Sequence, residues 1–344
     1  MVRNRTLVLR IGEVSVRFRE RHALSGGAVL AAALATVFLA LTIGDGGIQP
    51  NSILHALAPD ASGSERLVFE WRGARAIAAL LFGACLAIGG AIFQTLTRNP
   101  LGSPDIIGLG AGSYAGVVVV LMAGGSGLLT MALGAVAGGL GAAALVYVLA
   151  FRRGMHGFRF IVVGIALGAM LRALTSWFSV KADLDAALRA AIWDAGTLAG
   201  MTWEQLGGAS IVAAVLFCSL PFVARVLPQL ELGEDAAASL GLRTESAKAM
   251  LVLAGVGFTA LVTAITGPIS FIALAAPQIA KRLTAHGQRA GLILSALVGA
   301  ALLGAADLAA QHLLAGVSLP VGGVTVVIGG LYLVWLLIRE GNRT

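Results

Sequence analysis

Long apolar runs separated by short polar stretches cover most of the 344-residue chain. They fall near residues 27–43, 73–96, 104–123, 127–150, 158–180, 205–226, 246–266, 269–284, 290–309 and 320–338. One helical span of a bilayer takes roughly 20 mostly apolar residues, so the pattern predicts about ten transmembrane helices. The runs lack the alternation of barrel strands, and unpaired backbone groups are costly in lipid. We therefore expect an all-α polytopic membrane protein.

The change from basic to apolar residues near residue 27 divides the chain into two parts. These are a basic cytoplasmic N-terminal tail at 1–26 and a transmembrane domain at 27–344. A retained first helix is favoured over a cleaved signal peptide, because the basic region is long for a signal and further hydrophobic segments follow. Val14, Val16 and Phe18 alternate with other residues in the tail. This alternation is too weak to define the structure of the tail.

Composition supports the membrane interpretation. The chain is 58% hydrophobic and only 12% charged, with a mean hydropathy of +0.90. These values exclude disorder, a disulfide scaffold and an ordinary cytosolic enzyme. The net charge of +7 does not indicate nucleic acid, because most of the 24 lysines and arginines fall on one side of the predicted spans. The positive-inside rule then places both termini in the cytoplasm of a multi-pass protein of the cell membrane.

The candidate chemistry is sparse. No Gly-Lys-Ser/Thr sequence occurs, so the chain cannot bind ATP through a P-loop of its own. We expect no catalytic residue, no bound cofactor and no metal site, since Cys85, Cys218 and the histidines are scattered. Asp105, Arg172 and Asp307 lie in or near apolar runs, where each could be a proton relay or a structural group. If the chain is part of an ATP-driven pump, a separate subunit must therefore bind and hydrolyse the ATP.

A loop at about 228–245 is the candidate docking place for such a subunit. Glu234 and Asp235 suit the first turn of a short cytoplasmic helix at about 234–240, because acids complement the helix dipole there. Gly241 is a natural stop for that helix. The helix would present two leucines to an apolar groove on a partner, Leu240 and Leu242. A solvated connector remains the alternative interpretation.

Two other places carry polar residues of interest. Thr97-Arg-Asn-Pro100 closes the second run, where Pro100 blocks further helix and Arg98 can reach lipid headgroups. At the opposite end of that run, Arg72 and Arg75 depart from the positive-inside trend and could bind lipid phosphate or acids of an extracytoplasmic partner. Gly267-Pro268 predicts a tight outer turn.

Several sequence blocks in register carry a resemblance to a known family. They are Gly83-Ala-Cys-Leu-Ala-Ile-Gly-Gly-Ala-Ile-Phe-Gln94, Thr95-Leu-Thr-Arg-Asn-Pro-Leu-Gly-Ser-Pro-Asp-Ile-Ile-Gly108, Leu232-Gly-Glu-Asp-Ala-Ala-Ala-Ser-Leu-Gly241, Gly267-Pro-Ile-Ser-Phe-Ile-Ala-Leu274 and Leu319-Pro-Val-Gly322. From about residue 27 to 340, the chain resembles a permease subunit of the iron-siderophore/cobalamin class of ABC importers. Within that class it most resembles the G-type subunit of ferric-enterobactin permeases.

The resemblance implies a type II ABC importer permease that moves a ferric siderophore into the cytoplasm by alternating access between two permeases. Implied partners are a second permease, with a heterodimer favoured over a homodimer, two ATPase subunits that hold ATP and Mg, an extracytoplasmic substrate-binding protein and membrane lipid. Haem, cobalamin or another metal chelate is an alternative cargo. An ion-gradient-driven secondary transporter is the alternative from another class.

The resemblance also assigns residues. The ATPase-coupling set is Glu231, Leu232, Gly233, Glu234, Asp235, Ala236, Ala237, Leu240 and Gly241. The binding-protein docking set is Arg72 and Arg75. The structural family motifs are Gln94, Arg98, Asn99, Pro100, Gly267, Pro268, Pro277, Asp307 and Pro320. Substrate-binding residues are not assigned. The chain departs from the family pattern at Gly73-Ala74, at Gln278 in place of a histidine, and at Gln311 in place of an arginine in many relatives.

Overall fold

The computed structural model describes residues 6–11, 14–43, 63–105, 108–125, 127–150, 157–284, 291–314 and 317–341. Residues 1–5 and 12–13 of the basic tail and the last residues, 342–344, lie outside the described residues.

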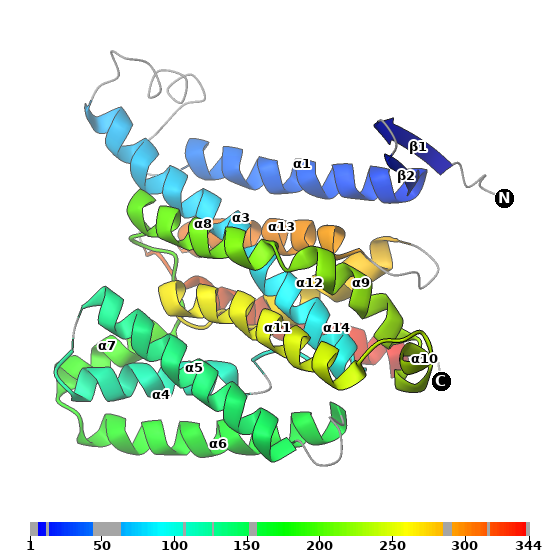
Figure 1. The fold of residues 1–344 in the computed structure, drawn as a ribbon. Coiled ribbons are helices and arrows are strands. Elements are labelled where there is room, and N and C mark those ends of the chain that lie inside the picture. Colours follow the sequence, from blue (N-terminus) through cyan, green and yellow to red (C-terminus); the bar gives the residue numbers. More distant parts are fainter. Residues whose placement is uncertain are drawn as a thin grey trace.

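The tail contains a β-hairpin. β1 (Thr6–Ile11) and β2 (Val14–Arg19) pair antiparallel, with Thr6 opposite Arg19 and Ile11 opposite Val14. Apolar residues alternate with others along β2, which is the period of a strand. The helical prediction therefore holds for the apolar part of the chain, and the tail departs from it. α1 (Glu20–Thr42) follows directly and begins ahead of the first predicted apolar run (Figure 1).

Helices make up the rest of the described elements. Their bounds are α3 (Gly63–Thr97), α4 (Leu109–Met122), α5 (Leu128–Ala150), α6 (Gly157–Lys181), α7 (Leu184–Asp194), α8 (Trp203–Phe217), α9 (Leu220–Glu231), α10 (Glu234–Ser239), α11 (Thr244–Thr266), α12 (Ile272–Leu283), α13 (Leu292–His312) and α14 (Val321–Gly341). Every predicted apolar run overlaps one of these helices or, at 205–226, the pair α8 and α9.

Six helices in the described part of the chain, α1, α3, α5, α6, α11 and α13, are long and apolar enough to cross a membrane. α8 and α9 could together form a further span, bent by 49°. Pro221 lies in the first turn of α9, where a proline has no N–H to continue the preceding helix. α4 and the Val321–Tyr332 part of α14 are shorter apolar helices. The total of ten spans and the cytoplasmic side of both termini stay predictions.

Two elements differ from the apolar pattern. α4 begins only at Leu109, because Gly108 directly before it has a left-handed backbone with a φ of 85°. α7 was not predicted. Its composition is mixed, with Arg189 and Asp185 forming an exposed ion pair at 2.9 Å, so a search for apolar runs passes over it.

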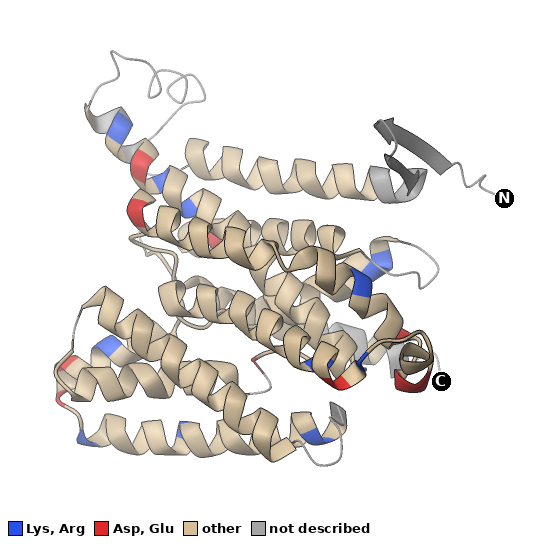
Figure 2. Cartoon of the chain, viewed as in Figure 1, with Lys and Arg blue, Asp and Glu red and all other residues tan. Residues whose placement is uncertain are grey.

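α3 lies at the centre of the bundle and packs against α1, α11, α12 and α13 (Figure 1). Close approach depends on glycines: a Cβ on Gly83 or on Gly299 would clash with the backbone of the other. A Cβ on Gly90 would clash with the carbonyl of Ala273, which has no helical N–H partner because Pro277 follows four residues later. Charged residues lie mostly near the helix ends (Figure 2).

Candidate functional site

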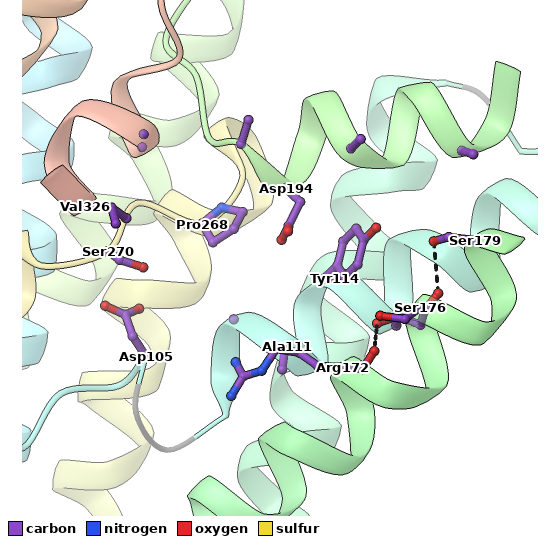
Figure 3. Close-up of a pocket in the computed structure, with 17 residues that line it drawn as sticks. Asp105, Ala111, Tyr114, Arg172, Ser176, Ser179, Asp194, Pro268, Ser270 and Val326 are labelled. Atoms are coloured by element: carbon purple, nitrogen blue, oxygen red, sulfur yellow. Dashed lines mark hydrogen bonds between the residues drawn. The ribbon is translucent and has the colours of Figure 1, made fainter. Parts of the chain in front are cut away.

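A cavity of about 760 Å³ opens beside α6 and α7. Its walls come from the α3–α4 connection, α4, α6, α7, the α11–α12 connection and the start of α14 (Figure 3). The lining residues are Asp105, Gly110, Ala111, Tyr114, Arg172, Thr175, Ser176, Ser179, Ala187, Ala191, Asp194, Ala195, Pro268, Ser270, Gly322, Gly323 and Val326. Its volume falls within the range of roughly 300–1,000 Å³ that is typical of ligand pockets.

One face of α6 supplies much of the polar lining. Arg172, Ser176 and Ser179 follow one another at helical spacing, so their side chains share a face. The Thr175 hydroxyl donates to the carbonyls of Leu171 and Arg172, each at 3.0 Å, and the Ser179 hydroxyl donates to the Thr175 carbonyl at 2.9 Å. These bonds satisfy the hydroxyl donors of Thr175 and Ser179 inside an apolar helix.

Two backbone hydrogen bonds and one close approach of backbone to backbone hold the opposite wall together. The amide of Thr197 donates to the carbonyl of Thr266 at 2.7 Å, and the amide of Gly322 donates to Gly196 at 2.9 Å. Gly267 has a φ of 75°, and a Cβ there would clash with the carbonyl of Trp193. Only glycine fits this turn, because its positive φ and the close approach both exclude a side chain. The predicted tight turn is confirmed, and its Pro268 lines the cavity.

Asp105 reaches the cavity from the α3–α4 connection. The backbone of Phe271 lies next to its carboxylate, whose Oδ2 is buried and has no hydrogen-bond partner among the described residues. Phe271 itself has a φ of 69°, which is unusual for a residue with a side chain. The two connections that carry Asp105 and Phe271 are therefore held against each other at the edge of the cavity.

Glutamines connect that edge to α3. Gln94 is buried and donates to the carbonyl of Leu274 at 2.9 Å. Gln278 donates to Gln94 at 2.6 Å and to the Pro100 carbonyl at 3.3 Å. The amide nitrogen of Gln278 thus bridges α12 and the end of α3 at the position where the resemblance expects a histidine. Asn99 closes the neighbouring turn by accepting from the amide of Leu101.

The short helix predicted at 234–240 is present as α10. Gly241 has a φ of 86°, and the amide of Leu242 donates to the carbonyl of Ala237, as in a Schellman stop. Leu240 is 64% exposed, in keeping with the expectation. Leu242 is instead half-buried against the core, and Ala237 is fully buried, so these two residues attach α10 to the bundle.

Glu234 connects α10 to two other elements. Its carboxylate pairs with Lys248 of α11 at 2.5 Å and with Arg98, just beyond α3, at 3.7 Å. Lys248 is 5% exposed and also pairs with Glu245 at 3.1 Å. Burial in a less polar surrounding strengthens such pairs, so α10 is anchored by charge as well as by apolar packing.

The two arginines near the start of α3 have different surroundings. Arg75 donates to both oxygens of Asp307, with contacts of 2.8 to 3.1 Å, and Gln311 donates to Asp307 at 2.8 Å. The side chains of Arg75 and Asp307 are 14% and 3% exposed. Arg72 donates to the Ile43 carbonyl at 3.4 Å. A second cavity of about 380 Å³ is lined by Trp71, Arg72, Arg75, Gly200, Met201, Thr202 and Gln311.

The structure thus brings the predicted motif residues into separate groups. Gln94, Pro100 and Pro277 lie around the end of α3, and Asp307 lies with Arg75 near its start. Pro320 immediately precedes α14, and its carbonyl accepts from the amide of Val324 at 3.4 Å. The described residues contain no cluster of three histidine, cysteine or acidic side chains that could hold a metal ion.

The sequence alone does not show which residues line the cavity. It assigns no role to Asp194, Tyr114 or Ser176, and it marks Arg172 only as a possible proton relay or structural group. The available signal was the polar spacing on α6, where Arg172, Ser176 and Ser179 interrupt an apolar run at intervals of one turn. The remaining lining residues come from segments far apart in the sequence, and no local pattern joins them.

The bundle of long apolar helices indicates a polytopic membrane protein. Residues 32–339 match the FecCD transport family, so the chain belongs to that family. It is a multi-pass permease of the class that serves metal-chelate, siderophore and vitamin B12 ABC importers.

Relatives span nearly the whole chain. The chain is 42% identical over 297 residues to the ferric enterobactin transport system permease protein FepG of Escherichia coli K12, covering 86% of this chain and 90% of FepG. It is 34% identical over 314 residues to the vitamin B12 import system permease protein BtuC of Citrobacter koseri, covering 89% and 92%.

A solved structure confirms the fold. An inward-facing conformation of a metal-chelate type ABC transporter matches with a TM-score of 0.81 and 25% sequence identity. The match covers 92% of this chain and 99% of the solved chain. The type II importer permease fold expected from the sequence is therefore supported.

Proposed function

We propose that this chain is the permease subunit of an ATP-driven importer whose cargo is a ferric siderophore. The observation that carries the proposal is the similarity to FepG along 90% of that protein, whose name gives ferric enterobactin as the cargo. The cavity beside α6 and α7 would hold the cargo during passage. Alternating access would open it first to the outside and then to the cytoplasm.

A second permease would complete the transport pathway. The cavity is open on one side, and Val326 on its rim is 47% exposed, which suits a surface that another helical subunit covers. We favour a heterodimer over a homodimer because the chain resembles a G-type subunit. The cargo would then travel between two related but unequal walls.

Two ATPase subunits would supply the energy, with ATP and Mg²⁺ held by those subunits and no cofactor held by this chain. We assign the coupling contact to α10 and the residues beside it. Leu232 and Leu240 are 59% and 64% exposed, so they can enter an apolar groove on the ATPase. Glu234 attaches α10 to Arg98 and Lys248, and force on α10 would therefore move the adjoining ends of α3 and α11.

An extracytoplasmic binding protein would deliver the cargo at the opposite end of α3. Arg72 lies on the cavity of about 380 Å³ there and is our candidate for contact with acids of that protein. Arg75 lines the same cavity, but its guanidinium is held by Asp307. We therefore assign Arg75 to positioning the start of α3, with Arg72 carrying the docking charge.

The test is uptake by the assembled importer. The chain is purified together with a candidate second permease, ATPase and binding protein, and the complex is placed in liposomes. We expect ATP-dependent accumulation of a radiolabelled ferric siderophore, and none when the P-loop lysine of the ATPase is replaced. Uptake driven by an ion gradient without nucleotide would contradict the proposal, as would a complex that carries no ferric chelate.

A further inference from the structure

The β-hairpin of the N-terminal tail separates its residues by chemistry. Residues that lie opposite each other in an antiparallel pair share one face of the sheet, and successive residues along a strand alternate between the two faces. By the observed register, one face holds only apolar residues: Leu7, Leu9, Ile11, Val14, Val16 and Phe18. The other face holds three arginines, two hydroxyl residues and one valine: Arg10, Arg17, Arg19, Thr6, Ser15 and Val8. The hairpin is therefore amphipathic along both strands.

The hairpin lies at the edge of the described structure. Among the described elements it packs mainly on α1, through β2, and Figure 1 shows it beyond the N-terminal end of α1, apart from the other helices. A two-stranded hairpin is marginally stable at best in water and needs a surface against which its apolar face can pack. We therefore expect the surface that covers this face outside the helical bundle.

The connection to α1 determines where that surface lies. β2 ends at Arg19, α1 begins at Glu20, and the apolar stretch that can cross a membrane begins at Leu24. The residues between Arg19 and Leu24 span about 6 Å as helix, at a rise of about 1.5 Å per residue. The hairpin consequently lies at the level of the lipid headgroups, at the point where α1 enters the bilayer.

α1 brings the hairpin next to lipid. This helix packs on α3 and α13, and only 11% of its membrane-crossing stretch is buried. Leu30, Leu34 and Phe38 follow one another at helical spacing and are exposed, so they form a face toward the hydrocarbon of the bilayer. An apolar hairpin face beside this helix can enter the same apolar phase.

The charge of the tail complements an anionic lipid surface. Residues 1–26 contain six arginines and two glutamates. Anionic headgroups favour binding of a basic segment beside the membrane by about fivefold for each lysine or arginine. Arginine can also bury its apolar stem while its guanidinium reaches phosphate oxygens. A basic face combined with an apolar face is the pattern of amphipathic segments that lie in the membrane interface.

We propose that the hairpin binds the membrane surface: its apolar face enters the boundary between headgroups and acyl chains, and Arg10, Arg17 and Arg19 bind the phosphates of anionic lipids. The hairpin then holds the start of α1 at a fixed depth in the bilayer. Residues 6–19 precede the part of the chain that matches the FecCD family, residues 32–339. This role is therefore additional to the proposed import function and does not depend on it.

Spin labels on the full-length chain in vesicles test the orientation of the hairpin. Cys85 and Cys218 are replaced by alanine, and one nitroxide is attached through Val16→Cys or through Ser15→Cys, which are neighbours on opposite faces. The vesicles are phosphatidylcholine alone or equimolar phosphatidylcholine and phosphatidylglycerol. We expect the label at position 16 to collide with lipid-soluble oxygen and to be shielded from a water-soluble nickel chelate. The label at position 15 should be more accessible to the chelate.

Substitutions on each face separate the apolar contribution from the charged one. Leu9→Gln should lower the ratio of immersed to mobile label at position 16. Val8→Gln is the matched control, because Val8 is the neighbouring apolar residue on the basic face, and it should leave the ratio unchanged. Replacing the three arginines of that face by glutamine should lower the ratio about 100-fold in the anionic vesicles and little in phosphatidylcholine alone, whereas replacement by lysine should retain it.

Four results would overturn the proposal. Equal access of the chelate to labels at positions 15 and 16 in both vesicles would place the hairpin in water. A label at position 16 that is shielded from oxygen as well as from the chelate would place that face against protein, such as a second copy of this chain. Equal losses in Leu9→Gln and Val8→Gln would show that the two faces do not differ. Shielding that is insensitive both to phosphatidylglycerol and to the glutamine substitutions would show that the arginines do not bind lipid phosphate.

Discussion

The pair of Arg75 and Asp307 shows how one contact can change the interpretation of a residue. The sequence marks Arg75 as an exception to the positive-inside trend and Asp307 as an acid in an apolar run. Their 232-residue separation gives no local sign that they meet. The structure joins them in a buried bidentate pair, which makes Arg75 a positioning residue and leaves Asp307 poorly placed for an ion relay.

This pair should be important for stability. Asp307→Asn leaves the Arg75 guanidinium without its counter-charge, and loss of one partner of a buried ion pair typically costs about 3–5 kcal/mol. We expect that loss in the free energy of unfolding, measured by denaturant titration of the purified chain in detergent. Arg72→Gln is the control, because Arg72 makes only one long contact with a backbone carbonyl. Equal free energies of unfolding for Asp307→Asn and wild type would show that the ion pair of Arg75 and Asp307 does not stabilise the fold.

At the scale of elements, the sequence predicts what local chemistry determines. α10 follows from two acids in its first turn and from the left-handed stop at Gly241. Each apolar run overlaps a helix, or at 205–226 a pair of helices. The apolar pattern does not predict α7, because Asp185 and Arg189 interrupt the apolar residues of this helix. The contact between Gly83 and Gly299 shows that their two helices approach closely. The sequence does not show which glycine contacts which, so these pairs are known only from the structure.

The exposed leucine of α10 gives a direct test of coupling. Leu240→Asp places a charge where we propose that an apolar groove of the ATPase receives the side chain. Because Leu240 is largely exposed in this chain, the variant should fold and insert. We expect ATP hydrolysis to continue while ATP-dependent uptake in liposomes is lost, whereas Leu240→Met retains uptake. Wild-type uptake by Leu240→Asp would exclude α10 as the coupling element.

The ion pairs of Glu234 test whether α10 moves together with the bundle. Glu234→Gln removes the links from α10 to both Lys248 and Arg98. Glu245→Gln is a matched control, because it also removes an acid from Lys248 but leaves α10 attached. We expect fewer cargo molecules imported per ATP hydrolysed in Glu234→Gln than in Glu245→Gln. Equal ratios in the two variants would show that these links do not transmit motion.

At the scale of the whole molecule, the sequence indicates a membrane bundle but not the cavity inside it. Asp105 and Tyr114 lie before and within α4, and Arg172 and Asp194 lie on α6 and α7. The α11–α12 connection and the start of α14, much later in the chain, complete the lining, and backbone contacts at Gly196 and Gly267 hold them there. Hydropathy measures only how apolar each segment is. It carries no information on which segments enclose a space, so the cavity could be found only from the fold.

Docking of the proposed binding protein also involves the whole molecule. The charge of Arg72 should attract acids of that protein before the two surfaces touch. Rim charges change association rates and salt dependence more than they change packing. Arg72→Glu should therefore weaken binding of the loaded binding protein at low salt, and the difference from wild type should shrink as ionic strength rises and the Debye length falls to about 8 Å at physiological salt. Surface plasmon resonance on the complex in nanodiscs measures both rates.

Arg189→Glu serves as the control for this measurement, because it reverses one charge of an exposed ion pair on α7, away from the cavity that Arg72 lines. Arg75→Glu cannot serve, since it would place two acids together at Asp307 and disturb the start of α3. If Arg72→Glu and Arg189→Glu bind with the same affinity at low salt, the binding protein does not use Arg72. A loss that is insensitive to salt would instead indicate a change in local structure, because screening acts on charge and not on packing.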